Sequence, residues 1–371
     1  MSDTTNQLYI GLLSGTSVDG VDAGLFEFDA RNNITLISSY HQPYPAEIRD
    51  AILRLSQPGD NEIDRMGALD VALGELFGSA ALTVIEQENI QTESITAIGS
   101  HGQTIRHRPN QKYAFSLQVG DPNTIAHISG VTTVADMRRM DMAAGGQGAP
   151  LAPAFHQAVF YSHNERRCII NIGGISNISV LHDDENKVIG YDTGPGNLLM
   201  DNWVSTHLRR NYDENGDWAK TGNINKALLM KLLSHPYLQK NFPKSTGRED
   251  FNRAWLEQIL SNLSPIAAAD VQASLCEFTA QSLSQSIQHH AIDAAYICGG
   301  GAHNQTLMQR ISAHLPDIKV DTTSALNINP DWVEAGLFAW LAKQRIDGKK
   351  TNLISVTGAS QPTTIGAIYS P

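Results

Sequence analysis

Short apolar runs separated by turn residues open the chain. LYIGLLSG, VDAGLFEF and NITLISSY each have the length of a strand, and the Gly-rich turn TSVDG separates the first two. Because Asp-Gly is a common hairpin dipeptide, these runs predict an antiparallel meander of three strands. Apolar residues then recur at helical spacing over residues 45–90, and ITAIGSHGQT returns to a strand followed by a loop.

The same order of elements recurs in the second half of the chain. CIINIGG, ISNISVL and KVIGYDTGPG again predict strand, Gly-rich turn, strand and strand, after a segment rich in Gly, Pro and Ala that is typical of a crossover between domains. The remaining pattern predicts helices over about 197–210, 223–234, 251–261 and 267–289, then the strand AAYICGGG, a helix from Asn304, the strand IKVDTT and a helix near Pro330. This alternation predicts an α/β protein with a sheet in each half.

Composition narrows the class of protein. A chain of 371 residues exceeds the usual size of one hydrophobic core, so two domains with a cleft between them are expected. A net charge of -11 argues against nucleic-acid binding, and we find no apolar run long enough to span a bilayer. The N-terminus lacks the pattern of a signal peptide. Three widely spaced cysteines indicate reduced, buried thiols, so we expect a cytoplasmic protein.

Three glycine clusters are the main chemical signal, because bare backbone can approach a phosphate or a purine closely. The first two follow apolar strands at the start of each meander, and the third lies between a strand and a helix. Either of the first two alone is typical of an ordinary tight turn, and the matched pair favours a shared ligand. The candidate nucleotide-binding residues are Gly15, Thr16, Ser17, Val18, Asp19, Gly20, Val21 and Asp22, then Gly173, Gly174, Ser176 and Asn177, then Gly299, Gly300, Gly301 and Asn304.

Polar residues after predicted strands complete the candidate site. Asp192 stands in DTGPGN, between a strand and a helix, where it is a cleft-facing carboxylate or simply a helix cap. Gln103 and Thr104 lie in a predicted polar loop suited to sugar hydroxyls. Arg138 is suited to a carboxylate or to a surface salt bridge, and Glu334 opens a helix, where an acid is also favoured by the helix dipole.

The sequence resembles the anhydro-N-acetylmuramic acid kinases, within the actin, sugar kinase and Hsp70 superfamily, over essentially its whole length. The matching segments are GLLSGTSVDGVD, AIGSHGQTIRH, VADMRRMDMAAGGQGAPLAPAFH, NIGGISNIS, YDTGPGNLLMD, KSTGRE and ICGGGAHN. The resemblance implies a two-domain actin-like (ribonuclease H-like) fold with a central cleft. Its domains would be residues 1–133, to which about 352–371 return, and residues 134–351.

The resemblance also implies an activity, which is ATP-dependent conversion of 1,6-anhydro-N-acetylmuramic acid and water to N-acetylmuramic acid 6-phosphate in cell-wall recycling. It places the general base at Asp192, suggests that Glu334 reaches the cleft, and suggests a homodimer. With this substrate, the chemistry of Gln103, Thr104 and Arg138 assigns these residues to the sugar. Mg²⁺ would be touched through water by Asp19 or Asp22, because Leu13 and Asn171 stand where the superfamily usually has aspartates. The alternatives are an ordinary sugar-hydroxyl kinase and a non-enzymatic actin-like ATP-binding protein.

Overall fold

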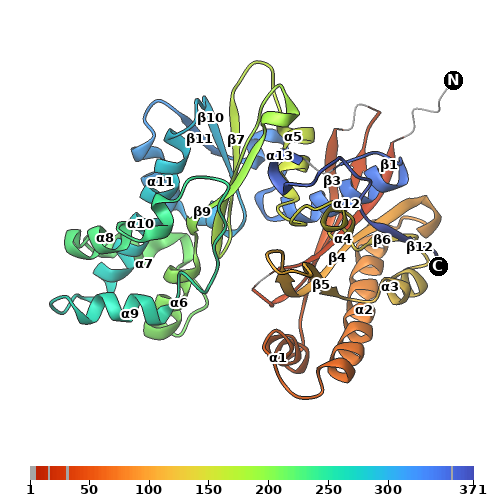
Figure 1. The fold of residues 1–371 in the computed structure, drawn as a ribbon, viewed down its shortest axis with the longest axis horizontal. Helices are drawn as coiled ribbons and strands as arrows, with labels where there is room; N and C mark the ends of the chain where they lie inside the picture. The colour runs from red at the N-terminus through yellow and green to blue at the C-terminus, as the bar shows by residue number, and fades with distance from the viewer. Residues whose placement is uncertain (1–5, 16, 31–32, 352–353) are drawn as a thin grey trace. The chain divides into compact units, whose positions relative to one another are not determined.

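The computed structural model describes residues 6–15, 17–30, 33–351 and 354–371, and these fall into two compact units. Unit 1 is Met1–Val159 with Trp332–Pro371, and unit 2 is Phe160–Asp331 (Figure 1). The first boundary lies later than the expected 133/134, because β6 (Thr133–Ala135) pairs with the first sheet. The chain returns earlier than the expected residue 352, because α12 (Val333–Ile346) packs on strands of the first sheet.

Unit 1 is built on one mixed sheet. Its strand order is β12-β6-β4-β1-β2-β3, with β5 paired to β4; β1, β2 and β3 are antiparallel neighbours, and β1, β4 and β6 run parallel. The elements are β1 (Gln7–Ser14), β2 (Gly20–Phe28), β3 (Ile34–Pro43), α1 (Ala46–Leu55), α2 (Glu62–Gln87), η1 (Thr92–Ser94), β4 (Ile95–Arg108), β5 (Phe115–Val119), α3 (Pro122–Ser129), β6 (Thr133–Ala135), α4 (Arg139–Ala143), α5 (Ala152–Phe160), α12 (Val333–Ile346), α13 (Ile354–Thr357) and β12 (Ala367–Tyr369).

Alternate residues of β1 and β4 lie on opposite faces of this sheet. On one face Ile10 and Ile98 are buried in a core with Phe77 of α2. On the other face Gly11 lies under α12, since a Cβ there would come within 1.8 Å of the Ala335 carbonyl oxygen. The absence of a side chain therefore lets α12 lie directly against the sheet (Figure 1).

Helix α2 is the one helix in the described part of the chain with the length and apolarity of a membrane span, contrary to the sequence expectation that no such run exists. Half of its most apolar window is buried. Leu73, Phe77 and Val84 of this helix belong to the core beneath the sheet of unit 1. Its apolarity is therefore that of a core helix.

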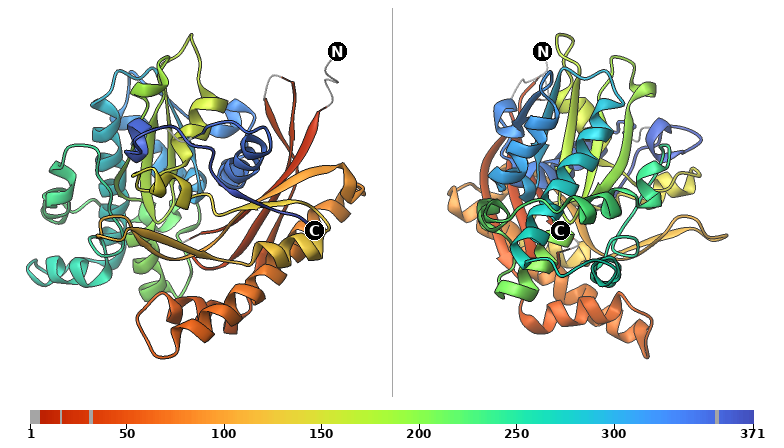
Figure 2. Two further views of the ribbon diagram at one scale, coloured as in Figure 1. Left: turned by 45° about the vertical axis from the view of Figure 1, so that its right-hand side comes forward. Right: turned by 90° about the vertical axis from the view of Figure 1, so that its left-hand side faces the viewer.

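Unit 2 repeats the arrangement. Its sheet has the order β11-β10-β7-β8-β9, with β7, β8 and β9 antiparallel neighbours and β7, β10 and β11 parallel. The blue-green helices lie beside it in Figure 2, and α10 contributes Phe278 and Leu283 to its core. The elements are β7 (Arg167–Ile172), β8 (Ile175–Val180), η2 (Glu185–Lys187), β9 (Ile189–Pro195), α6 (Leu198–Leu208), η3 (Glu214–Gly216), α7 (Asp217–Thr221), α8 (Lys226–Leu233), η4 (Pro236–Gln239), α9 (Arg253–Ser261), α10 (Ala268–Gln288), β10 (Ala294–Cys298), η5 (Gly300–His303), α11 (Gln305–His314), β11 (Lys319–Thr322), η6 (Thr323–Leu326) and η7 (Pro330–Trp332).

The two sheets have one topology. In each, three antiparallel strands in the order 3-2-1 are continued by two strands parallel to the first. This duplicated order confirms the predicted α/β class and the ribonuclease H-like, actin-like fold. The prediction of a loop at residues 100–104 was wrong, because β4 continues through these polar residues by pairing with β1 up to Gln103 and with β5 up to Arg108.

Candidate functional site

The first glycine-rich turn joins β1 to β2 in unit 1. Ser17 Oγ donates to Asp19 Oδ1 at 2.7 Å, and the Tyr44 amide donates to the Asp19 carbonyl at 2.9 Å, so the turn is anchored on both sides of Asp19. Val18 adopts a left-handed φ of 55° and buries its side chain in the core. The candidate Thr16 lies outside the described residues.

Three further candidates from this region, Gly20, Val21 and Asp22, lie on β2. The Val21 side chain is fully buried, so Val18 and Val21 can present only backbone groups to a ligand. Asp22 is partly exposed, and its Oδ1 is 2.7 Å from His41 Nδ1 on the neighbouring strand β3. Gly20 is required by the fold itself, because a Cβ there would lie 2.3 Å from the Gln42 carbonyl oxygen.

A buried polar cluster lies at the end of β1, beside the middle of β4. Ser14 Oγ donates to Gln103 Oε1 at 2.6 Å, and Gln103 Nε2 donates to the Thr104 carbonyl at 3.2 Å. Thr104 Oγ1 in turn accepts from Gln118 at 3.1 Å. Gln103 is 3% exposed, so its amide already ties the strands together. The Ser100 hydroxyl, on the same strand, is buried without a hydrogen-bond partner in the described chain.

Arg138 is held within unit 1. Its guanidinium donates to His101 Nε2, at 2.9 Å from Nη2, and to the Gly148 carbonyl at 2.7 Å. Burial lowers the pKa of Arg138 to about 10, opposed by the nearby carboxylates of Glu334 and Asp141. Burial, together with Arg138, holds the pKa of His101 well below its usual value, so His101 is a neutral acceptor. The structure therefore brings Arg138 and Glu334 together at the start of α12.

The second glycine-rich turn, Gly173–Gly174, joins β7 to β8 in unit 2. The segment after β9 closes over it, because the amides of Gly196 and Asn197 donate to the carbonyls of Gly174 and Gly173 at 2.9 and 2.8 Å. Thr279 Oγ1 of α10 also donates to the Gly196 carbonyl at 2.9 Å. Backbone bonds thus fix this turn without any charged group.

The third glycine cluster follows β10 at the same edge of the sheet. Gly299 has a φ of 76° and approaches Asn171 at the end of β7, whose buried Oδ1 has no hydrogen-bond partner in the described chain. The side chain of Asn304 is already used as the cap of α11, since its Oδ1 accepts from the Leu307 amide at 2.9 Å. Ser176 is fully buried, also without a partner for its hydroxyl there. The second and third clusters therefore meet at the ends of neighbouring strands.

The glycines of these clusters fall into two kinds. At Gly196 and Gly301 an added Cβ would come within 2.3 Å of Gly173 O and Ile172 Cγ2 respectively, so the packing requires glycine. At a second set the nearest atom to such a Cβ is 3.6 Å away or more, and no left-handed φ is imposed. This open set is Gly15, Gly173, Gly174 and Gly300. Nothing in the described part of the chain explains glycine at these positions, which is what a closely approaching ligand requires.

Asp192 lies within β9, three residues before its end, and not on a turn at the end of the strand as predicted. β9 is an edge strand, and its free edge is completed by the segment that follows η4. The Asp192 amide donates to the Lys244 carbonyl at 3.2 Å, and Tyr237 Oη donates to the Asp192 carbonyl at 2.7 Å. Asp192 Oδ2 accepts from the Thr246 amide at 3.0 Å. Burial raises the pKa of Asp192 to about 6, against the lowering effect of the Thr246 bond.

Sequence reasoning missed the carboxylate of Asp201 and the partners of Asp192. Asp201 lies in α6, and its burial near Asp213 raises its pKa to about 7. Thr246 lies in KSTGRE, one of the segments that carry the family resemblance. A carboxylate buried by tertiary packing leaves no local pattern in the sequence. Neither the burial of Asp201 nor the contact of Thr246 with Asp192 could therefore be predicted from residue spacing.

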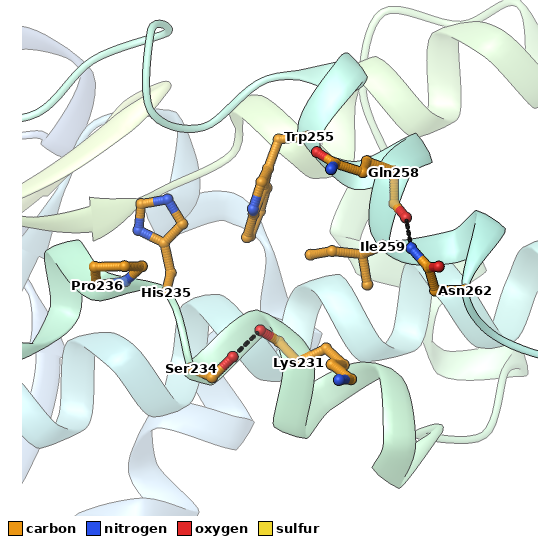
Figure 3. Close-up of a pocket in the computed structure, with 8 residues that line it drawn as sticks. All are labelled: Lys231, Ser234, His235, Pro236, Trp255, Gln258, Ile259 and Asn262. Atoms are coloured by element: carbon orange, nitrogen blue, oxygen red, sulfur yellow. Dashed lines mark hydrogen bonds between the residues drawn. The ribbon is translucent and has the colours of Figure 1, made fainter.

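Two hollows lie in unit 2. One, between α8 and α9, is lined by the residues drawn in Figure 3, among them His235 and Trp255, whose ring centroids are 5.0 Å apart; it contains no predicted site residue. The other is lined by Tyr191 and Thr193, which flank Asp192, and by Lys240 and Lys244. Because neighbouring residues of a strand point to opposite faces, this second hollow lies across β9 from the Asp192 side chain.

The titratable groups of the described chain offer no ready-made metal cage, since no cluster of three or more His, Cys, Asp or Glu side chains occurs there. Asp19 and Asp22 are nevertheless two carboxylates at one exposed turn. Cys168, Cys276 and Cys298 are buried and form no disulfide, as expected.

The duplicated fold, with glycine turns at the ends of its first strands, is the framework of an actin-like phosphotransferase. A family model described as anhydro-N-acetylmuramic acid kinase matches residues 7–371. Anhydro-N-acetylmuramic acid kinases of Coxiella burnetii and of a Shewanella species are 49% and 48% identical to the chain, covering 97% and 98% of it and equal shares of their own length. The chain therefore belongs to the anhydro-N-acetylmuramic acid kinase family and is a kinase, which implies use of ATP and a small sugar substrate.

Among solved structures, component A of the (R)-2-hydroxyglutaryl-CoA dehydratase of Acidaminococcus fermentans covers 90% of the chain and 98% of its own, with a TM-score of 0.47 and 9% identity. Because this similarity is low, the fold is assigned from the strand order of the two sheets.

Proposed function

We propose that this kinase hydrolyses the 1,6-anhydro ring of 1,6-anhydro-N-acetylmuramic acid and phosphorylates the released O6, giving N-acetylmuramic acid 6-phosphate and ADP in cell-wall recycling. The names of the family and of the relatives support the substrate. The observation that carries the mechanism is the state of Asp192, a largely buried carboxylate with one oxygen held by a backbone N–H and a pKa raised to about 6. Such a group is ionised at neutral pH and basic enough to accept a proton.

In the proposed step, water attacks C1 of the sugar while Asp192 takes its proton. The bond from C1 to the bridging oxygen breaks, and that oxygen bonds to the γ-phosphorus of ATP as the bond from this phosphorus to ADP breaks. The transferred phosphoryl group thus takes the place that a general acid occupies in an inverting glycosidase. The proton on Asp192 then returns to solvent.

Nucleotide binding is assigned to the glycine turns. Gly15, Gly173, Gly174 and Gly300 leave space for a Cβ that no described residue fills, which supports close approach of phosphate or nucleoside to bare backbone. Ser17, Ser176, Asn177 and Asn304 would add hydroxyl and amide groups around them. Of these, Ser17 and Asn304 already make internal hydrogen bonds, so their role would lie in shaping the turns.

Mg²⁺ fits the first turn only as an ion held through water. Asp19 and Asp22 are close in the chain, and each already accepts a hydrogen bond or ion pair, from Ser17 and His41 respectively. They would hold hydrated Mg²⁺, which supplies charge neutralisation for the phosphates when it is bound.

The sugar is assigned to the polar residues of unit 1 around the end of β1 and the start of α12. Arg138 and Glu334 lie together, Gln103 and Thr104 lie where the pairing of β4 with β1 ends, and the buried Ser100 hydroxyl has no partner in the described chain. A guanidinium anchored by His101 and Gly148 is a preorganised partner for the carboxylate of the lactyl group. The buried thiols are consistent with action in the reducing cytoplasm.

The proposal is tested with Asp192→Asn. We expect kcat to fall by about a thousandfold while ATP and sugar still bind, because the amide keeps the shape but cannot accept a proton. Turnover is measured by mass spectrometry of the product in ¹⁸O water, and binding by calorimetry. In the wild type kcat should fall as pH drops through about 6, since protonation removes the base.

Two outcomes would contradict the proposal. Equal losses of binding and of rate in Asp192→Asn would make Asp192 a structural residue. Wild-type product without ¹⁸O at C1 would point to an ordinary sugar-hydroxyl kinase instead.

A further inference from the structure

Resting on the proposed role of Asp192, we infer that Thr246, locked by Asp250, is a positioning residue that orients the Asp192 carboxylate for attack. The segment 244–250 lies along the free edge of β9 and provides the Thr246 amide hydrogen that binds Asp192 Oδ2 at 3.0 Å. No hydrogen bond to Oδ1 occurs in the described chain. The geometry therefore divides the carboxylate into one oxygen that is held and one that is available to water.

The segment is itself a closed turn. Thr246 Oγ1 donates to Asp250 Oδ2 at 2.7 Å, and the amides of Asp250 and Phe251 both donate to the Gly247 carbonyl at 3.2 Å. Phe251 is fully buried and packs edge-on against Tyr237 and Trp255. The turn is thereby fastened to the core at one end and closed at the other by the Thr246–Asp250 bond.

The backbone of Asp192 depends on the same segment. Its amide bonds to the Lys244 carbonyl, and its carbonyl accepts from Tyr237 Oη, so both main-chain groups at the free edge of β9 are satisfied there. A shift of Thr246 would therefore change the direction of the carboxylate before it changed the sheet. This distinguishes positioning from general support of the fold.

The groups around Asp192 predict how its pKa responds when the hydrogen bond from Thr246 is weakened. Burial and the nearby Glu249 carboxylate raise the pKa of Asp192, and the Thr246 N–H lowers it. Tyr237 also lies beside it, and burial together with Asp192 raises the pKa of that phenol. Lys244 and Asp250 are further charged residues of the segment that binds Asp192. Weakening the Thr246 bond should thus raise the pKa of Asp192 further, because the carboxylate loses its one hydrogen-bond donor.

The test is Thr246→Val, which keeps the shape but removes the hydroxyl that binds Asp250. We expect kcat to fall about tenfold and the acid limb of the kcat profile to move up by about one pH unit, with KM for ATP and sugar unchanged. Thr246→Ser should restore both values. Thr83→Val serves as the matched control, because Thr83 Oγ1 bonds only within α2, to the Ser79 carbonyl.

An acid limb at the wild-type pH in Thr246→Val, or a serine variant as impaired as the valine, would overturn the inference. Should the valine variant not fold, Asp250→Ala removes the same bond from the other side and must give the same shift. Asp192→Asn separates the two proposals. If it retains turnover, the proposed function fails; if it is inactive while Thr246→Val has a normal profile, only the positioning role fails.

Discussion

The first turns of the two sheets occupy equivalent places in one topology, yet they are built differently. In unit 1 the turn between β1 and β2 carries Ser17 and Asp19, Asp22 follows on β2, and side-chain contacts hold both carboxylates. In unit 2 the turn between β7 and β8 is two glycines, held by the amides of Gly196 and Asn197. The duplicated strand order thus positions a turn in each unit, while the chemistry at each turn is set separately.

This difference indicates that the two turns provide different chemical groups for ligand binding. Carboxylates suit a hydrated cation, whereas neutral backbone suits the close approach of an anion or a purine. The comparison also separates glycines that the fold needs from glycines that only a ligand needs. Substitutions can therefore test each turn against its counterpart.

The largest effect on stability is expected from Gly196→Ala. Its Cβ would lie 2.3 Å from the Gly173 carbonyl oxygen, so the closure over the second turn must move. We expect a loss of about 2 to 3 kcal/mol of unfolding free energy, as is typical of overpacking, together with loss of activity. Chemical denaturation of the purified protein measures the first effect.

Gly174→Ala is the matched control in the same turn, where the nearest atom to a Cβ is 3.9 Å away. Its unfolding free energy should equal that of the wild type. If both alanine variants were equally unstable, the distinction between fold-required and ligand-required glycines would be wrong.

A smaller effect, confined to binding, is expected from Gly173→Ala. The turn has room for the added methyl group, so stability should be unchanged. KM for ATP should rise roughly tenfold, since the methyl group keeps phosphate from the bare backbone and loses about one hydrogen bond's worth of affinity. Steady-state kinetics with ATP varied at saturating sugar measures this change.

The counterpart in unit 1, Gly15→Ala, should behave in the same way, because the nearest atom to its Cβ among the described residues is Ser17 Oγ at 3.6 Å. An unchanged KM for ATP in both variants would show that neither turn meets the nucleotide. A change in only one would show which unit binds the phosphates.

Local pattern was enough to predict the α/β class with a sheet in each half, whereas the family resemblance implied the actin-like fold. Alternating apolar runs predicted both meanders, and helical spacing predicted α6, α8, α9 and α10 close to their observed bounds. The polar run 100–104 was assigned to a loop because its continuation as β4 depends on pairing with Gln118 and its neighbours on β5. Local composition does not predict the pairing of strands that are distant in the sequence.

The candidate site was predicted in part for the same reason. Glycine clusters and the DTGPGN motif are local signals, so the turns and Asp192 could be named from sequence. The partners that tune Asp192, namely Thr246 and Tyr237, join it through tertiary contacts across more than forty residues of chain. Only coordinates bring them together.

The smallest effect is expected from Asp19→Asn, which tests the charged character of the unit 1 turn. The amide can still accept from Ser17, so the turn should keep its shape. The Mg²⁺ concentration for half-maximal rate should rise about twofold to fivefold, because an exposed charge acting through water contributes at most about 1 kcal/mol. The rate at saturating Mg²⁺ should be unchanged. Asp60→Asn, an exposed acid between α1 and α2, is the control for net charge. Equal Mg²⁺ dependence in both variants would remove Asp19 from the metal site and with it the contrast between the two turns.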